Sequence, residues 1–429
     1  MVVEKSNIKA GFINFVKEKS FFINCGLISL LFLANCFLPF FSYIAFAYVF
    51  VMIIVDNLKN DLGYIFFSLP FAGLYIPISV ILFFACIFIY IIKFVIIKAV
   101  EHEIKFSFSK SLIIFSALLL AYLLLPFSFK YNINLLIKVF SVFALLAVLY
   151  LIIKFPKDVV LKDNFRILAI ALLIASIFYS FRPLSEHLQE AIKVFYISDG
   201  MIRFSGLFYN PNIFALICEI GVFTMAYYIM CAKTNKKDVM AFLIFLLLGI
   251  MTFSKTYIVI MSIVMVFLTM YAIKTSSKQA WFCVGAFVLA IMLVVAFVPK
   301  FILVYLNRFG TSTGDGVQNS GDEIINTITT GRLDVWKGYI KFLLDNPLVI
   351  LFGSGFSATT IGVYSTHNMY LGLIYQIGIV GTALLCTVVF LVIKNATKGT
   401  NFKFNLAIVV PILCILLIGM IEDFIFYVE

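Results

Sequence analysis

The sequence predicts an all-α protein, a polytopic integral membrane helical bundle with about 12–13 transmembrane helices. Composition is the first reason: 63% of the 429 residues are hydrophobic and 12% are charged, whereas soluble globular proteins are roughly half apolar and about a quarter charged. The second reason is that the 50 Phe residues and the long apolar runs extend over the whole chain. These features exclude a disordered protein, a disulfide scaffold and a soluble enzyme with a single membrane anchor.

Segments that cross a hydrocarbon core of ~30 Å need about 17–25 mostly apolar residues. Runs that approach or exceed this length occur at 111–128, 132–152, 167–181, 213–231, 239–254, 256–273, 280–298, 367–393 and 405–425. The run at 21–56 is interrupted at Pro39, which predicts a tight hairpin of two spans. The run at 64–100 contains Pro70 and Pro77, so that one tilted helix and two short helices both remain open.

The distribution of charge favours two spans in each of these two runs, which gives about 13 spans and leaves 12 open. Most of the 32 Lys and Arg residues then lie on the side of the N-terminus, as expected for the cytoplasmic side of a membrane. The net charge of +11 is therefore a topology signal, and no nucleic acid is expected as a partner. The expected divisions are helices 1–11 within 1–298, with an outer loop near 182–212, an outer loop or cap at 299–366, and C-terminal helices at 367–429.

The outer loop at 299–366 is expected to carry short amphipathic helices. Its clearest helical pattern runs from Arg332 to Leu344. One face of this segment is apolar and is made of Leu333, Trp336, Ile340, Leu343 and Leu344. We expect this helix to lie on the membrane domain or to cap it.

No metal site or cofactor is expected. The eight cysteines lie in or beside apolar runs, without Cys-x-x-Cys spacing or a neighbouring histidine cluster, and are typical of small buried apolar residues. The sequence has no Gly-x4-Gly-Lys-Ser/Thr loop, so nucleotide hydrolysis is unsupported. The absence of an Asp-x-Asp pair argues against a metal-dependent enzyme that uses nucleotide sugars.

His367, one of three histidines, stands at the outer mouth of a predicted span. Thr366 and Asn368 beside it can be explained as helix-capping residues, and His367 itself could be an interfacial residue without a task. Gly378 and Gly381 follow on nearly the same helical face and would allow another helix to approach closely. A histidine above a closely packed seam is a better candidate for a site than one that faces lipid.

A second candidate segment enters the span at 213–231. Asn210, Pro211 and Asn212 predict a turn and a helix start, but that explanation leaves Arg203 without a role. Two turns further on, Glu219 lies within the apolar run, and an intramembrane carboxylate is a functional or a paired residue by default. It could instead be a structural partner for Lys255 or another cation.

Two more cations are predicted on the same side of the membrane. Lys255 lies at a tight turn between two spans, where it could simply be a lysine that extends to the interface, and Arg332 opens the amphipathic segment. Cations arranged in this way suit a diphosphate, because Arg grips phosphate oxygens bidentately and Lys acts as a point charge. A histidine such as His367 suits proton removal from a hydroxyl, since its pKa lies near the operating pH.

These segments resemble the O-antigen ligase and polymerase superfamily of bacterial envelope enzymes. The resemblance covers roughly 203–381 and rests on five pieces in the family's order: Arg203-x-Ser-Gly206-x-Phe-x-Asn210-Pro211-Asn212, Ser254-Lys255, Gly331-Arg332-x3-Trp336, Phe352-Gly353-x-Gly355, and His367-Asn368-x-Tyr370-Leu371 with Gly378 and Gly381. It implies a GT-C-like fold and a metal-independent, inverting glycosyltransferase with its active site facing the periplasm of the bacterial inner membrane. By the same resemblance, Arg203 and Arg332 would contact the diphosphate and His367 would activate the acceptor.

Within this superfamily the Gly331-Arg332-x3-Trp336 piece and the moderate length of the outer loop resemble the polymerases slightly more, and this resemblance implies an O-antigen or capsular polysaccharide polymerase. Such an enzyme joins oligosaccharide repeat units when donor and acceptor are both linked to undecaprenyl diphosphate, in the lipid bilayer and with a chain-length regulator as a further partner. Lys255, Asn210, Asn212, Glu219, Asn368 and Tyr370 are the residues expected to bind substrate. The alternatives are an O-antigen ligase that transfers glycan to lipid A-core, a lipid-linked-oligosaccharide flippase, and a non-catalytic scaffold; a flippase would be expected to place its charges near the bilayer midplane.

Overall fold

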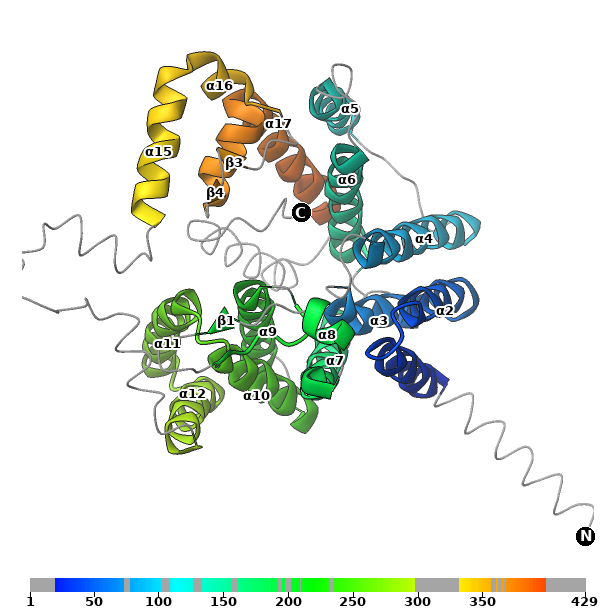
Figure 1. The fold of residues 1–429 in the computed structure, drawn as a ribbon, viewed down its shortest axis with the longest axis vertical. Coiled ribbons are helices and arrows are strands. Elements are labelled where there is room, and N and C mark those ends of the chain that lie inside the picture. The colour runs from blue at the N-terminus through cyan, green and yellow to red at the C-terminus, as the bar shows by residue number, and fades with distance from the viewer. Residues whose placement is uncertain are drawn as a thin grey trace, which may run out of the picture.

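The computed structural model is an all-α bundle (Figure 1). The described residues are 20–72, 78–101, 109–125, 133–155, 160–184, 186–191, 195–196, 202–208, 210–231, 235–297, 332–355, 360–361, 364–365 and 368–398. The helices with their bounds are Ser20–Asn35, α2 (Phe41–Val55), α3 (Leu58–Ser68), α4 (Ile78–Val100), α5 (Lys110–Leu124), α6 (Ile133–Lys154), α7 (Leu161–Tyr179), α8 (Glu186–Ala191), α9 (Pro211–Cys231), α10 (Lys236–Met251), α11 (Lys255–Thr275), α12 (Lys278–Phe297), α15 (Arg332–Asp345), α16 (Pro347–Phe352) and α17 (Met369–Thr397).

Short irregular elements lie between the helices. Two 3-10 turns are present, η1 (Leu69–Phe71) and η3 (Arg182–Leu184). Two antiparallel hairpins of two-residue strands complete the described fold; they pair β1 (Phe195–Tyr196) with β2 (Ile202–Arg203), and β3 (Thr360–Ile361) with β4 (Tyr364–Ser365).

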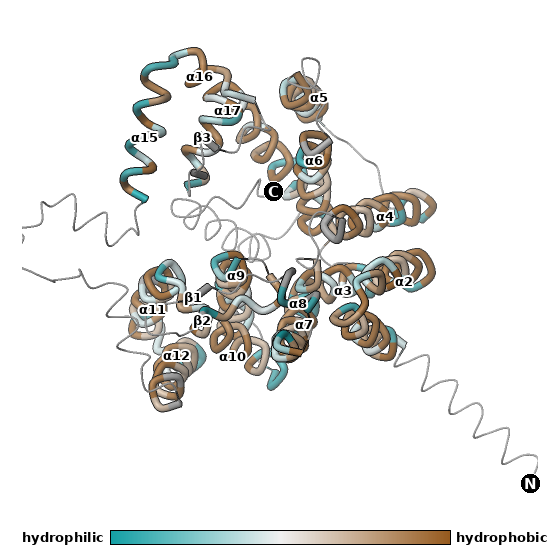
Figure 2. Tube along the Cα trace, in the orientation of Figure 1, coloured by the Kyte–Doolittle hydropathy of each residue, from teal (hydrophilic) through white to brown (hydrophobic). Residues whose placement is uncertain are grey.

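The helices have the length and hydropathy of membrane spans. Five of them, among the described residues, are long and apolar enough to cross a membrane: Ile81–Val100, Leu135–Lys154, Pro211–Met230, Lys255–Thr275 and Met369–Thr397. Four shorter helices are also apolar, at Ser20–Asn35, Phe41–Val55, Lys110–Leu124 and Lys278–Leu293. Figure 2 shows that most of these helices are hydrophobic along their length. The prediction of an all-α polytopic membrane protein is confirmed, while the predicted span at 405–425 lies outside the described residues.

The two proline-containing runs near the N-terminus are both divided. The turn at 36–40 separates Ser20–Asn35 from α2, as the predicted hairpin requires. In the run at 64–100, α3 ends at Ser68 and η1 follows it, so that one continuous helix is excluded and α4 begins separately. A buried ion pair of 2.8 Å between Asp61 of α3 and Lys93 of α4 holds the two pieces together.

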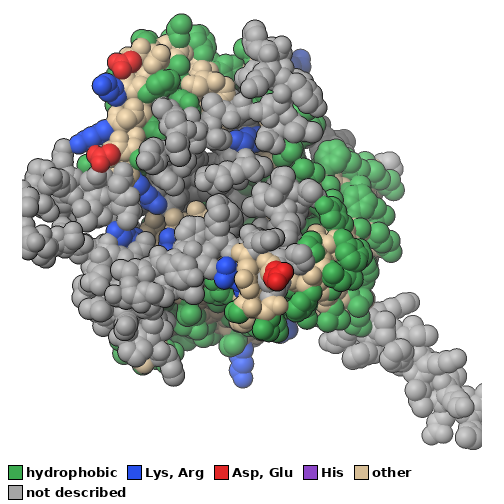
Figure 3. Space-filling model, viewed as in Figure 1, with side chains coloured by type: hydrophobic (Ala, Val, Ile, Leu, Met, Phe, Trp, Pro, Cys, Tyr) green, Lys and Arg blue, Asp and Glu red, His purple; other side chains and the backbone are tan. Residues whose placement is uncertain are grey.

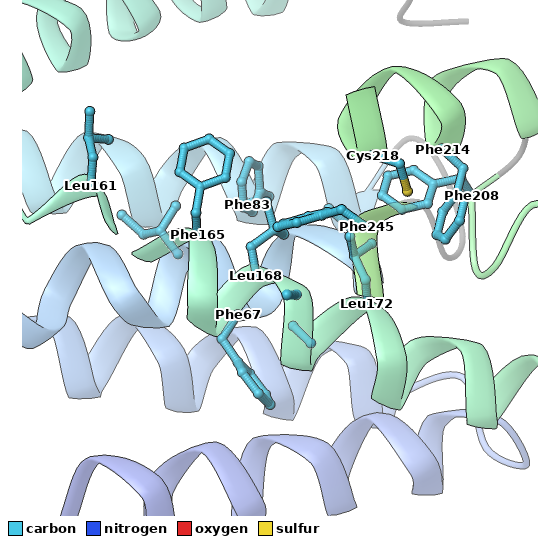
Figure 4. Close-up of a cluster of buried hydrophobic side chains, with 14 of the residues drawn as sticks. Phe67, Phe83, Leu161, Phe165, Leu168, Leu172, Phe208, Phe214, Cys218 and Phe245 are labelled. Atoms are coloured by element: carbon cyan, nitrogen blue, oxygen red, sulfur yellow. The ribbon is translucent and has the colours of Figure 1, made fainter. Parts of the chain in front are cut away.

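The core lies where α7 packs between α3 and α10 (Figure 4). Phe165 of α7 is the centre of an aromatic chain, with its ring centroid 5.5 Å from that of Phe66 and 6.2 Å from that of Phe245. Leu168 and Leu172 fill the turns below it and are fully buried. Aromatic pairs at such distances stabilise a packed interior beyond the area that they bury.

One end of the bundle is defined by polar contacts between helix termini. The amide of Asn395, near the end of α17, donates to Ser109 Oγ at the start of α5, at 3.1 Å. Lys154 Nζ, at the end of α6, donates to the carbonyl of Lys398 at 3.2 Å. The start of α7 follows α6 after a connection too short to cross the bundle, and so belongs to the same end.

The same end also contains the start of α10. Asp238 lies in its first turn and is fully buried. Its carboxylate pairs with Lys162 Nζ at 2.8 Å and accepts a hydrogen bond from Arg166 Nε at 2.8 Å. We refer to this end, with Ser109, Asp238 and Lys398, as the Asp238 end. The ends of α10 and α5 and the start of α11 then lie at the opposite end.

Candidate functional site

Arg203 is held in a fixed orientation by two hydrogen bonds. It lies in β2, where it pairs with Phe195 of β1. Its Nε donates to the carbonyl of Thr252 at 3.2 Å, and its Nη2 donates to Asn212 Oδ1 at 2.5 Å. The guanidinium therefore links the start of α9 to the turn between α10 and α11.

The sequence around Asn210 explains why α9 begins beside Arg203. Asn210 Oδ1 accepts from the backbone N–H of Asn212 at 2.8 Å, and its carbonyl accepts from Ile213 at 3.1 Å. Gly206 has a φ of 55°, and a Cβ there would lie 2.8 Å from the ring of Phe214. The predicted turn and helix start at Asn210 are confirmed. The side-chain oxygens of Asn210 and Asn212 both serve this local structure.

The turn between α10 and α11 brings Lys255 to the same place. Thr252 Oγ1 donates to the carbonyl of Gly249 at 2.7 Å and accepts from the N–H of Ser254 at 3.2 Å. Ser254 Oγ then caps α11 by accepting from Tyr257 at 3.4 Å, as residues of this type do at helix starts. Lys255 is the first residue of α11. Its backbone is thus fixed three residues after the carbonyl that binds Arg203.

Glu219 lies deeper in the same helix as Asn212. Its side chain is 1% exposed and belongs to the interior of the bundle. Burial of a carboxylate in an apolar span is costly unless other groups compensate its charge. A functional role for Glu219 and its pairing with Lys255 both stay predictions.

Arg332 belongs to a second group of elements, made of α15, α16 and α17. It is the first residue of α15, which begins where the amphipathic pattern predicted. The predicted apolar face is confirmed in part: Leu343 is buried and Leu333 and Trp336 are half-buried, but Ile340 and Leu344 are exposed and Tyr339 is buried instead. The reason is that α15 packs against α17, where the rings of Tyr339 and Tyr375 meet edge-on with centroids 5.3 Å apart.

The start of α17 is fixed by Asn368. Its Oδ1 accepts from the N–H groups of Tyr370 and Leu371, at 3.0 and 3.1 Å, so that the capping explanation is confirmed for Asn368. Tyr370 follows in the first turn with 39% of its surface exposed. His367 and Thr366 lie outside the described residues, and the role of His367 stays a prediction.

The helix that follows is not continuous. Gly378 has φ 64° and ψ −179°, which breaks α17. The expectation that Gly378 and Gly381 lie on one face of an unbroken helix below His367 is therefore wrong. Their expected role in close approach is confirmed, because a Cβ on Gly378 would lie 2.6 Å from the nitrogen of Gly353 and one on Gly381 would lie 2.5 Å from the ring of Tyr122.

The turn at Thr252 and the break in α17 lie at the same end of the bundle. The helix α10 begins at the Asp238 end, so that the turn at Thr252, and with it Arg203 and Lys255, lies at the opposite end. The helix α17 ends at the Asp238 end, and its break at Gly378 lies beside Tyr122 at the end of α5, so that this break also lies at the opposite end. We refer to it as the Arg203 end. Figure 3 shows Lys and Arg side chains around the middle of the face in view, between the α15–α17 group and the α9–α12 group.

Sequence reasoning missed two residues that shape the site. Thr252 acts through its main-chain carbonyl, which carries no sequence signature, although the tight turn at Lys255 was predicted. Tyr122, in a plain apolar run of α5, donates to main-chain carbonyls of α16 and α17. Among the described residues, no group of three or more His, Cys, Asp and Glu could hold a metal ion.

Comparison with known proteins identifies the family of one part of the chain. Residues 240–386 match the family model described as O-antigen ligase. This segment, about a third of the chain, runs from α10 to the middle of α17 and includes Lys255, Arg332 and Asn368, while Arg203 precedes it. Comparisons with curated proteins and with solved structures gave no match. The match supports glycosyltransferase-like activity on lipid-linked sugars, and the family model at residues 240–386 supports the O-antigen ligase and polymerase superfamily for this segment.

Proposed function

We propose that the protein is an O-antigen or capsular polysaccharide polymerase. It would be a metal-independent, inverting glycosyltransferase that joins oligosaccharide repeat units linked to undecaprenyl diphosphate. The observation that carries this proposal is the fixed guanidinium of Arg203, bound to Asn212 Oδ1 and the Thr252 carbonyl at the turn that opens into Lys255. A cation pair held at the end of an apolar bundle suits a lipid diphosphate, whose tail stays in the bilayer.

In this mechanism the cations stabilise the leaving group. The acceptor hydroxyl oxygen attacks the anomeric carbon of the donor sugar from the face opposite the diphosphate. The bond from that carbon to the diphosphate oxygen breaks, and its electron pair stays on the diphosphate, where Arg203 and Lys255 compensate the charge. His367 takes the proton of the acceptor hydroxyl. Preorganised donors at developing charge are commonly the largest single contribution to catalysis.

Arg332 would complete the clamp from the other side of the site. It opens α15, and α15 is fixed on α17 by the Tyr339 and Tyr375 rings. Asn368 caps the start of α17, and His367 precedes it in the sequence. The packing of α15 on α17 would therefore fix the position of Arg332 relative to His367. Tyr370 in the first turn of α17 is exposed enough to contact a sugar.

The Arg203 end would face the periplasm of a bacterial inner membrane. Support comes from the opposite end, where basic residues gather at helix termini: Lys154, Lys162, Arg166, Lys394 and Lys398. Lys and Arg near span ends favour the cytoplasmic side. A lipid-linked repeat unit would then be used after its transfer across the membrane.

A ligase remains the second candidate, because the family that matches residues 240–386 is described as O-antigen ligase. The two activities are separated by supplying lipid-linked repeat units to the purified protein in vesicles. A ladder of polymers without lipid A-core supports the polymerase. Products that form only after core is added would favour the ligase, and translocation without any new glycosidic bond would contradict both.

A further inference from the structure

The break in α17 leaves three consecutive carbonyls, at 375–377, that accept hydrogen bonds from outside the helix. Those of the first two residues accept from the backbone N–H groups of Ser354 and Gly355, at 2.7 and 3.0 Å. The third accepts from the hydroxyl of Tyr122 at 2.8 Å. An unpaired carbonyl in an apolar bundle costs several kcal/mol, so these donors from other elements are what allows α17 to break at Gly378.

Tyr122 joins three elements at this point. Its hydroxyl also lies 2.8 Å from the carbonyl of Phe352, the last residue of α16. A hydroxyl has one proton to donate, and it is shared between the carbonyls of Phe352 and Ile377. The ring reaches this position because Gly381 has no side chain, since a Cβ there would lie 2.5 Å from the ring.

The contacts of Tyr122 connect the two elements that carry Arg332 and Asn368. The α15–α16 arm carries Arg332 at its start and is anchored at its other end by the contacts at Phe352 and 353–355. The first part of α17 carries Asn368 at its start and is anchored at its other end by the break at Gly378. Both anchors meet at Tyr122. A displacement there moves the start of α15 relative to the start of α17.

We propose that Tyr122 is a positioning residue for glycosyl transfer. Its hydroxyl fixes the end of α16 on the broken α17. Together with the packing of Tyr339 on Tyr375, it thereby sets the separation of Arg332 from the start of α17, where His367 precedes Asn368. This inference rests on the proposed function for the roles of Arg332 and His367. Misplacement of reacting groups by about 1 Å can lower a rate by about 10², so that loss of a single hydrogen-bonding group far from the diphosphate can be visible in kcat.

The test is Tyr122→Phe, which keeps the ring against Gly381 and removes only the hydroxyl. The matched control is Tyr48→Phe, which removes a hydroxyl that donates to Asn24 Oδ1 at 2.9 Å in a different part of the bundle. We expect Tyr122→Phe to lower kcat for elongation about tenfold or more, with the KM for the lipid-linked donor within about twofold of the parent. The control keeps the parent kcat.

A distance measurement tests the geometry without any activity. One spin label is attached at Gly338→Cys on α15, where the backbone has no heavy atom within 4 Å of the added side chain, and another at the native, exposed Cys386 in the second part of α17. Protein without Gly338→Cys gives the labelling background. The expected result is a distance distribution that broadens in Tyr122→Phe and stays narrow in Tyr48→Phe.

The outcomes separate this inference from the proposed function. A parent-like kcat in Tyr122→Phe, or an unchanged narrow distribution, overturns the positioning role. An equal fall of folded protein, kcat and affinity in both variants also overturns it, because that pattern is general destabilisation. If the parent protein forms no glycosidic bond but the distribution broadens only in Tyr122→Phe, the anchoring by Tyr122 is supported while the polymerase proposal fails.

Discussion

Gly353 and Gly378 lie against each other with no side chain between their backbones. A Cβ on Gly378 would come within 2.6 Å of the nitrogen of Gly353, and a Cβ on Gly353 would collide with the carbonyl of Gln376. Both glycines also have positive φ angles, of 78° and 64°, which residues with side chains rarely adopt. The end of α16 and the break in α17 therefore form one joint. Each glycine is required there for two reasons, the lack of space for a side chain and the positive φ angle.

Gly378→Ala is expected to destabilise the folded protein. The new methyl group meets the backbone of Leu351 and Gly353, and the positive φ alone costs about 1–3 kcal/mol. A clear fall in the midpoint of thermal unfolding in detergent is the expected result. The matched control is Gly285→Ala in α12, where an added Cβ meets nothing within 4 Å and helix propensity is expected to stabilise slightly. Equal midpoints for parent and Gly378→Ala would contradict the joint.

This joint also shows what the sequence could not predict. Hydropathy does not distinguish a straight span from a broken one, so the sequence predicts a single helix at 367–393. The break is stabilised by hydrogen bonds from Tyr122, Ser354 and Gly355, which come from other elements. By contrast, the bounds of α15 followed from its amphipathic period. The buried face of α15 was predicted only in part, because the burial of Tyr339 depends on the position of Tyr375 in a distant segment.

The candidate site also combines features that the sequence predicted with features that depend on tertiary contacts. The turn at Asn210 and the cap at Asn368 were predictable, because short polar side chains at helix starts bind their own backbone. The position of Arg203 was not, because one of its two acceptors is the main-chain oxygen of Thr252. Residue types at these positions indicated a diphosphate site, and tertiary contacts decided which oxygens orient the guanidinium.

Asp238 is expected to make folding stability dependent on pH. Burial tends to raise the pKa of this carboxyl, but the hydrogen bonds from Lys162 and from the Asn235 backbone, with the charge of Arg166, outweigh it and lower the pKa below its usual value. A depressed pKa stabilises the folded state above the unfolded-state value of about 3.9, and this contribution is lost as the pH falls through the folded-state pKa.

Asp238→Asn removes this contribution while the shape of the side chain is kept. At pH 7 we expect a loss of about 3 kcal/mol, because two cations lose a buried partner, and the difference from the parent should shrink as the pH falls below about 4. Thermal unfolding of both proteins between pH 7 and pH 3 measures this. Glu101→Gln is the control, since Glu101 pairs with Lys98 at 2.9 Å but is 47% exposed, and exposed pairs contribute about 1 kcal/mol or less. A gap that grows on acidification would reverse the sign argued here.

Arg203→Lys is expected to impair glycosyl transfer although the positive charge is kept. A lysine ammonium lacks the planar fork that reaches both the Thr252 carbonyl and Asn212 Oδ1, so that the cation is no longer fixed toward the diphosphate. We expect kcat for elongation to fall about 10²-fold, with the amount of folded protein unchanged. Arg182→Lys, in the 3-10 turn η3, is the matched control and should retain the parent rate. Full activity of Arg203→Lys would reduce the role of Arg203 to its charge.

Asn212→Asp separates the charge of the clamp from its geometry. The carboxylate is nearly isosteric with the amide and still accepts from Arg203 Nη2, now as a charge-assisted hydrogen bond, so the protein should fold at least as stably as the parent. The same carboxylate cancels the positive charge that the diphosphate requires and repels it. We therefore expect the KM for the lipid-linked donor to rise about tenfold or more, with the larger effect at low salt, where charges are less screened. Gln189→Glu adds the same charge to an exposed position in α8 and should leave KM unchanged. If Asn212→Asp bound and elongated the donor as the parent does, the anion at this site would not be a diphosphate gripped by Arg203.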